Sequence, residues 1–279
     1  MVKMKTKDIL IKAKQKLIEY HIDDREARLL LAYVLKCKTE DLIRYDDVEE
    51  DTYNKFEEVL NKRCSHIPYA YIVGHKEFMK LDFKVNENVL IPRGDTEILV
   101  EEVIKICEKI DRPEIRILDM CTGSGCIAIS LAKYISNALV TAVDISEEAL
   151  SVANENAKKN NVEVNFVKSD LFRDLDKQKF DIIISNPPYV KRSFIDNLDD
   201  EVKDNEPIIA LDGGEDGLDF YKVISNNARE YLKQDGILAF EIGYDEATNV
   251  SEILVNNGFK NIRVIKDYSN RDRDIIASY

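Results

Sequence analysis

The chain has 279 residues, enough for two domains with buried cores, and its 44% hydrophobic and 33% charged residues are typical of a soluble globular protein. No apolar run approaches the length of a membrane span, no signal-peptide pattern is present, and five cysteines without a Cys-x-x-Cys pair argue for reduced thiols and against a zinc site, so we expect a cytoplasmic protein. The net charge of −13 falls entirely on residues 65–279, and such an acidic region would repel a nucleic-acid backbone.

Residues 1–64 predict a separate domain built as a small bundle of helices. They contain no glycine or proline. Apolar side chains recur every three or four residues along three segments, at 10–17, 27–34 and 53–60. This spacing gives each helix one apolar face, which is more often core than binding site. We find no catalytic group in this part of the chain.

Residues 65–93 differ in composition and predict a β-hairpin linker between two domains. Aromatic and β-branched residues dominate positions 69–85, and Gly74 interrupts them. A helix is then expected to begin at Asp95 or Thr96.

From Ile115 onward, strand and helix patterns alternate, which predicts a doubly wound α/β domain over residues 94–279. Two further strands are expected at the end of the chain. The other expected strands cover residues 115–119, 139–144, 162–167, 180–185 and 236–242. In a sheet of this kind, ligands bind at the carboxyl ends of the strands.

The strand Phe180–Ser185 is expected at the centre of the sheet, since three isoleucines in a row suit a strand covered on both faces. It ends at Asn186-Pro187-Pro188-Tyr189, where two prolines cannot continue the ladder of hydrogen bonds. The Asn186 side-chain oxygen and the Pro187 carbonyl are two acceptors that can hold the hydrogens of an NH₂ group, while Tyr189 lies against its plane. Holding both hydrogens would aim a poorly nucleophilic nitrogen at an electrophile. For these four residues alone, a plain Pro-Pro turn is the alternative.

A glycine-rich loop, residues 120–125, follows the first strand of the sheet. Its glycines let the backbone approach a ligand closely, and the N-terminus of the next helix favours a negative group such as a carboxylate. The loop is not a P-loop, because no Gly-Lys-Ser/Thr follows, and it lacks the first glycine of a dinucleotide fingerprint. A tight structural turn is an equal alternative for the loop alone. Its candidate cofactor-binding residues are Cys121, Thr122, Gly123, Ser124 and Gly125.

Three aspartates end three successive strands near this loop. Asp144 can accept two ribose hydroxyls, and Asp170 can accept from an adenine amino group while Leu171 or Phe172 packs on the ring. Asp119 either contacts the ligand's amino group or braces the loop. Each aspartate alone is more often a cap or turn residue. Together with the Asn-Pro-Pro-Tyr loop, they predict a cofactor site built entirely from Asp119 onward.

The chain resembles class I S-adenosylmethionine-dependent methyltransferases, which carry a glycine loop after the first strand and an acid after the second. Members that methylate planar nitrogens have [Asp/Asn/Ser]-Pro-Pro-[Tyr/Phe/Trp] after the fourth strand. Nearly the whole chain is further similar to the HemK-type glutamine methyltransferases of peptide chain release factors. Gly94 and Asp95 depart from that family, which usually has Pro and Glu there. The stretches that carry the resemblance are residues 67–74, 89–93, 96–97, 118–125, 186–189 and 211–218.

The resemblance implies a Rossmann-like methyltransferase domain with a seven-stranded mixed sheet over residues 94–279, and a helical substrate-recognition domain over residues 1–64. It implies transfer of a methyl group from S-adenosylmethionine, with S-adenosylhomocysteine as product, to the glutamine amide nitrogen in a release factor's Gly-Gly-Gln loop. Asn186 and the Pro187 carbonyl would hold that amide, and Pro188 and Tyr189 would shape its slot. The implied enzyme is a monomer that needs no metal, no membrane and no sequence-specific nucleic acid.

Two other functions remain open from the sequence. An amino methyltransferase of adenine or guanine in DNA or RNA would use the same loop on a flipped base. Such an enzyme usually needs a basic face, and Lys191-Arg192 is the only basic pair next to the loop. A non-catalytic regulator that binds S-adenosylmethionine would keep the fold without needing the Asn-Pro-Pro-Tyr loop.

Overall fold

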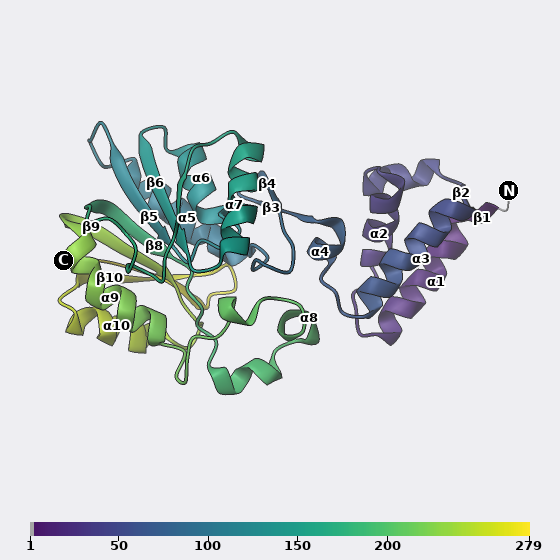
Figure 1. Ribbon diagram of the computed structural model, residues 1–279. Coiled ribbons are helices and arrows are strands. Elements are labelled where there is room, and N and C mark those ends of the chain that lie inside the picture. The colour runs from purple at the N-terminus through teal and green to yellow at the C-terminus, as the bar shows by residue number, and fades with distance from the viewer. Residues whose placement is uncertain (1–2) are drawn as a thin grey trace. The chain divides into compact units, whose positions relative to one another are not determined.

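The structure, a computed structural model, describes residues 3–279 and divides into two compact units (Figure 1). The helical unit comprises the residues up to Gly74 together with Asp200–Asn205, and the sheet unit comprises His75–Asp199 and Glu206–Tyr279. The short segment Asp200–Asn205 therefore leaves the sheet unit and returns to it. Within residues 3–279, no helix combines the length and the apolar character needed to cross a membrane.

The helical unit contains the helices that the apolar stripes predict. They are α1 (Thr6–Glu19), α2 (Glu26–Leu35) and α3 (Glu50–Cys64), with a 3₁₀ turn η1 (Thr39–Arg44) and a short antiparallel ribbon of β1 (Lys3–Lys5) and β2 (Asp47–Glu49). One face of each helix meets the others in a common apolar core. Its most deeply buried side chains include Leu17, Ala27, Leu30, Leu31, Phe56 and Leu60.

The β-hairpin predicted for residues 65–93 is wrong in its first part. Residues 69–73 form a short helix, α4 (Tyr69–Val73), and only β3 (His75–Phe78) and β4 (Leu81–Lys84) form a hairpin. The Pro68 carbonyl accepts hydrogen bonds from the backbone of the first turn, and Gly74, with φ of 78°, ends the helix. Tyr69 and Ile72 pack on the core of the helical unit. This packing outweighs the β-propensity of their side chains.

The sheet unit is built on the predicted seven-stranded mixed sheet. Its strand order is β10-β11-β9-β8-β5-β6-β7; the five strands from β9 to β7 are parallel, and the last strand in sequence, β11, pairs antiparallel with β9. The strands are β5 (Ile115–Met120), β6 (Ala138–Asp144), β7 (Asn165–Lys168), β8 (Phe180–Ser185), β9 (Leu232–Glu241), β10 (Lys260–Lys266) and β11 (Asp272–Ser278). Every residue of β8 is buried, as its apolar run predicts.

Helices cover both faces of this sheet (Figure 1). On one face, α5 (Gly94–Cys107), α6 (Cys126–Tyr134) and α7 (Glu147–Asn160) share an apolar core with the strands. On the other face, α9 (Asp219–Tyr231) and α10 (Ala247–Asn256) form a second core. Helix α5 begins at Gly94, one residue before the earliest predicted start.

The strand order reverses direction at β5, which has β8 on one side and β6 on the other. Met120 at the end of β5 pairs with Ser185 at the end of β8. The glycine-rich loop and the Asn-Pro-Pro-Tyr loop therefore leave the sheet side by side, at the topological switch point where open α/β sheets bind ligands.

Candidate active site

A cavity opens at this switch point, and all of its lining residues belong to the sheet unit. Its wall includes most of the predicted site: Cys121, Thr122, Gly123, Ser124, Asp144, Asp170, Leu171, Asn186 and Pro188. Four predicted residues, Asp119, Gly125, Pro187 and Tyr189, lie next to the wall and not in it. Two further stretches also contribute to the wall, with Asn88, Val89, Leu90, Pro92, Arg93 and Thr96 in the first and Pro207, Ile209 and Ala210 in the second. The cavity wall therefore extends beyond the residues from Asp119 onward that the sequence predicts for the cofactor site.

Asp119 lies beneath the glycine-rich loop and braces it. Its Oδ2 atom accepts hydrogen bonds from the Thr122 hydroxyl at 2.6 Å and from the Ala128 backbone N–H at 3.2 Å. The carboxyl is fully buried, and burial raises its pKa to about 7. Of its two predicted roles, the geometry favours the brace over contact with a ligand.

Asp144 joins the end of β6 to the same loop. Its Oδ2 atom accepts from the Gly123 N–H at 2.8 Å, and its Oδ1 atom accepts from the Ser146 N–H at 3.0 Å. Burial raises the pKa of this carboxyl, although the backbone donors oppose that shift. Because each carboxylate oxygen has two lone pairs, both can still accept a hydrogen bond from a ligand in the cavity.

The end of β7 contributes an acid and an apolar side chain. Asp170 lines the cavity and pairs with Arg173 at 3.0 Å. Leu171 also lines the cavity, whereas Phe172 points into the core, where its ring stacks on Tyr231 with 4.6 Å between centroids. Of the two residues considered for packing on a ring, Leu171 is the one placed to do so.

The Asn-Pro-Pro-Tyr loop is held from behind by two buried polar side chains. Asn186 donates from Nδ2 to the Thr96 hydroxyl at 3.3 Å, and that hydroxyl donates to Glu241 Oε2 at 2.5 Å. The Tyr189 hydroxyl donates to Glu241 Oε1 at 3.4 Å. Burial raises the pKa of Tyr189 well above its usual value, so its hydroxyl stays protonated. Within residues 3–279, no donor is bonded to Asn186 Oδ1 or to the Pro187 carbonyl.

The backbone of Tyr189 is fixed by the glycine-rich segment of residues 211–218. The Val190 N–H donates to the Leu211 carbonyl at 2.9 Å, and the Gly213 N–H donates to the Val190 carbonyl at 2.8 Å. A Cβ atom at Gly213 would lie 2.7 Å from the Tyr189 Cα atom, so only glycine allows this approach. In the sequence, this segment is indicated only by the family resemblance, which gives it no role.

The sequence does not point to Thr96 and Glu241 as supports of this loop. It indicates Thr96 only as a possible helix start and as part of the resemblance, and it places Glu241 near the end of a predicted strand. A signal for Glu241 does exist, because it is an acid at the carboxyl end of an apolar, buried strand. It thus continues the series of polar strand ends formed by Asp119, Asp144 and Asp170.

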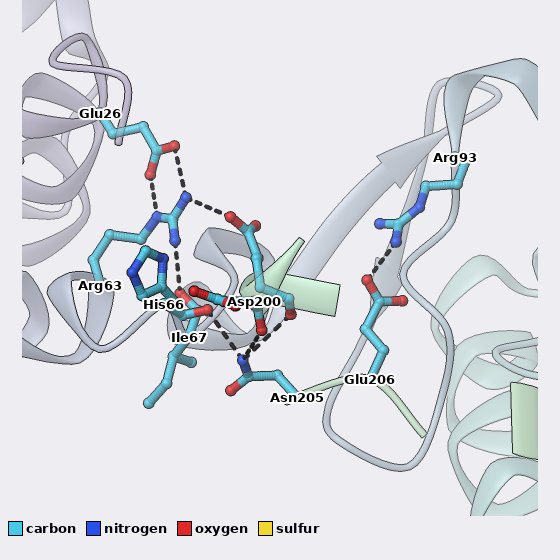
Figure 2. Close-up of polar contacts among 9 residues, drawn as sticks. Glu26, Arg63, His66, Ile67, Arg93, Asp200, Asn205 and Glu206 are labelled. Atoms are coloured by element: carbon cyan, nitrogen blue, oxygen red, sulfur yellow. Dashed lines mark hydrogen bonds and ion pairs between the residues drawn. The ribbon is translucent and has the colours of Figure 1, made fainter. Parts of the chain in front are cut away.

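The short segment of residues 200–206, which precedes the last part of the wall, is anchored near both of its ends (Figure 2). In the helical unit, Arg63 pairs with Glu26 and with Glu201 of α8 (Asp200–Lys203), each at 2.6 Å. In the sheet unit, the buried Glu206 pairs with Arg93. The wall residues 207–210 follow directly.

Comparison with known proteins gives two matching families along the chain. Residues 8–74 match the PrmC N-terminal domain, and residues 95–204 match the Methyltransferase small domain. Among solved structures, a methyltransferase from Pyrococcus furiosus is 20% identical, covers 78% of this chain and 98% of that chain, and superposes with a TM-score of 0.55. This likeness shows a shared fold.

Curated relatives carry the comparison further. A release factor glutamine methyltransferase of Clostridium acetobutylicum is 44% identical over 98% of this chain and 98% of that protein. Another protein of that name, from Fusobacterium nucleatum, is 47% identical over 83% of this chain and 66% of that longer protein. Identity of this extent over both matched domains shows that the chain belongs to the family of release factor glutamine methyltransferases.

Proposed function

We propose that this chain transfers a methyl group from S-adenosylmethionine to the side-chain amide nitrogen of the glutamine in the Gly-Gly-Gln loop of peptide chain release factors. The observation that carries the proposal is the pair of unbonded acceptors, Asn186 Oδ1 and the Pro187 carbonyl, on a loop that borders the cavity. Two acceptors match the two hydrogens of a primary amide.

The cavity has the groups that S-adenosylmethionine requires. Asp144 would accept from the ribose hydroxyls, and Asp170 would accept from the adenine amino group, with Leu171 against the ring. The glycine-rich loop and the N-terminus of α6 would face the carboxylate of the methionine part. When bound, S-adenosylmethionine supplies an electrophilic methyl group.

The protein's own part in the reaction is to position an amide that is a poor nucleophile. Asn186 and the Pro187 carbonyl hold its two hydrogens, so the nitrogen faces the methyl group and its lone pair is drawn out of conjugation. Tyr189, held by Glu241, and the buried Pro188 close the slot around the amide plane. An alkylated amide nitrogen is a strong acid, so its proton can leave without a histidine base.

Substrate recognition is assigned to the helical domain of residues 1–64, because a glutamine side chain alone offers the slot little binding energy. The enzyme acts as a monomer in the cytoplasm, on protein and not on a specific nucleic-acid sequence. The basic pair beside the loop does not favour a nucleic-acid substrate. Arg192 pairs with Asp212 at 2.8 Å and Lys191 lies 3.7 Å from Asp245, so both cations already face carboxylates.

Mass spectrometry tests the proposal directly. A purified release factor is incubated with the protein and S-adenosylmethionine, and its Gly-Gly-Gln peptide should gain one methyl group on the glutamine. A release factor with that glutamine replaced by glutamate is the control and should gain none. A methyl group on another residue, or on RNA added to the same mixture, would contradict the proposed substrate.

A further inference from the structure

Behind the Asn-Pro-Pro-Tyr loop lies a chain of buried polar side chains that takes no part in the proposed chemical step. Thr96 in the first turn of α5 and Glu241 at the end of β9 are each about 2% exposed. They are hydrogen-bonded to one another at 2.5 Å, and Thr96 is bonded to Asn186 at 3.3 Å. Buried polar groups in a core are expensive unless they are paired, so an arrangement of this kind calls for a reason.

The direction of these hydrogen bonds follows from the number of protons. A carboxylate can only accept, so the single proton of the Thr96 hydroxyl is donated to Glu241. The Thr96 oxygen can then only accept from Asn186, and the only donor on that side chain is Nδ2. With Nδ2 turned toward Thr96, the Oδ1 atom of Asn186 is the acceptor left for the substrate.

Each oxygen of Glu241 accepts a hydrogen bond from a hydroxyl, Oε2 from Thr96 and Oε1 from Tyr189, which is the arrangement that a carboxylate makes. Burial raises the pKa of Glu241, and the Thr96 hydroxyl and the charge of Arg273 oppose that shift. The neighbouring acid, Asp274, lies opposite Glu241 in the register of β11 and β9. Burial raises the pKa of Asp274 to about 8. Asp274 is therefore neutral at pH 7 and does not place a second negative charge beside Glu241.

We infer that Glu241, acting through Thr96, locks the Asn186 side chain with its oxygen toward the substrate slot, so both are positioning residues that make the slot accept an amide NH₂ and reject a carboxylate. The inference deepens the proposed function and rests on it. The same carboxylate receives the Tyr189 hydroxyl at 3.4 Å, so one group orients both ends of the loop. An Asn186 side chain turned by 180° would present N–H donors, which suit the oxygens of glutamate and repel the hydrogens of glutamine.

The test uses the full-length enzyme and an intact release factor, in single-turnover methylation and in calorimetry with S-adenosylmethionine. Thr96→Val keeps the shape of the side chain and removes the hydroxyl. Its methylation rate should fall about 10- to 100-fold, since misplacing a reacting group costs rates of that order. Its affinity for S-adenosylmethionine should fall far less than its rate, because Thr96 is only 2% exposed and adds little surface to the cavity wall. Thr96→Ser keeps the hydroxyl and should stay within about threefold of the wild-type rate.

Two further readouts separate orientation from packing. The release factor with glutamate in place of the methylated glutamine should inhibit Thr96→Val at least about fivefold more tightly than the wild type, because a turned Asn186 offers it a donor. Glu241→Gln should also lower the rate, because a glutamine can donate to Thr96 as well as accept. Combining it with Thr96→Val should add less than about threefold, since both act through one side chain.

The outcomes are distinguishable. A wild-type enzyme that leaves the release factor unmethylated overturns the proposed function and this inference with it. An active wild type with an equally active Thr96→Val variant overturns the inference alone. So does a Thr96→Ser variant as slow as Thr96→Val, because the methyl group and not the hydroxyl would then matter. If the glutamate form of the release factor inhibited Thr96→Val and the wild type equally, the inference would also be overturned. The same holds if the rate losses of the two single variants multiplied in the double variant.

Discussion

Replacing Gly213 by alanine should displace the Asn-Pro-Pro-Tyr loop by an amount that the structure defines. The added Cβ atom would lie 2.7 Å from the Tyr189 Cα atom and 2.8 Å from both the Tyr189 carbonyl carbon and the Gly217 oxygen. All three are backbone atoms, so no side-chain rotation relieves the contact. Ordinary contact begins near 3.4 Å, so the two segments must separate by about 0.7 Å, the difference between 3.4 and 2.7 Å.

Two hydrogen bonds resist that separation. The Val190 N–H and carbonyl are bonded to Leu211 and Gly213 at 2.9 and 2.8 Å, which holds the segments at their present distance. Overpacking of this kind costs about 1–3 kcal/mol of unfolding free energy. Moving a catalytic loop by somewhat less than 1 Å costs up to about 10²-fold in rate. We therefore expect the Gly213→Ala variant to fold, with methylation slowed about 10- to 100-fold.

The assay pairs denaturant unfolding with single-turnover methylation of a release factor. Gly94→Ala is the matched control, because a Cβ atom at Gly94 meets nothing within 4 Å and its φ lies outside the left-handed region. This change at the start of α5 should leave the rate unchanged and raise stability by about 0.4–1 kcal/mol. A Gly213→Ala enzyme within threefold of the wild-type rate would show that the Tyr189 backbone yields without consequence and would refute the reasoning.

Three further predictions concern single side chains. Asp144→Ala removes a charged acceptor and should weaken S-adenosylmethionine binding at least about tenfold in calorimetry; unchanged affinity would remove Asp144 from the site. Asn186→Ala should leave that affinity nearly intact and slow single-turnover methylation by about 10²–10³-fold; a loss below tenfold would contradict the clamp. Burial raises the pKa of Asp274 from 3.8 to about 8, so the folded state keeps a proton that the unfolded chain releases, and this group lowers stability as pH rises from about 4 to 8. Between pH 5 and 8, the Asp274→Asn variant should therefore lose less unfolding free energy than the wild type, by on the order of 2–4 kcal/mol. Equal losses for both proteins, measured by denaturant unfolding, would disprove the pKa shift.

The parts of the fold that follow from local pattern could be predicted from the sequence. The strand Phe180–Ser185 is apolar on both faces and lies at the centre of the sheet, and the groups that follow the strands meet at one edge because parallel strands end there. Residues 69–73 were mistaken for strand because their aromatic and β-branched side chains have strand propensity. Their helical form depends on packing against helices that precede them in the chain.

The support of the Asn-Pro-Pro-Tyr loop could not be read from local pattern at all. Thr96 and Glu241 are 145 residues apart in sequence, and a threonine at a helix start is ordinarily taken for a cap. Here its hydroxyl makes no cap bond and is directed to the acid. The packing of α5 on β9 decides which hydroxyl contacts the buried acid. The spacing of residues in the sequence does not indicate that packing.

Because of the segment that contains α8, no single boundary in the sequence separates the helical unit from the sheet unit. Glu201 is paired with Arg63, whose side chain is only 5% exposed, and Asn205 donates to the His66 carbonyl at 3.1 Å (Figure 2). The very next residue, Glu206, pairs with Arg93 and accepts from the Ile91 N–H at 3.3 Å, and residues 207–210 then line the cavity. A buried arginine that lost its carboxylates would carry an uncompensated charge, so these pairs hold the segment firmly. Removal of residues 1–64 would take Arg63 away from Glu201 only a few residues before the wall of the cavity. The helical domain proposed for substrate recognition is thus connected through the chain to the cavity proposed to bind the methyl donor.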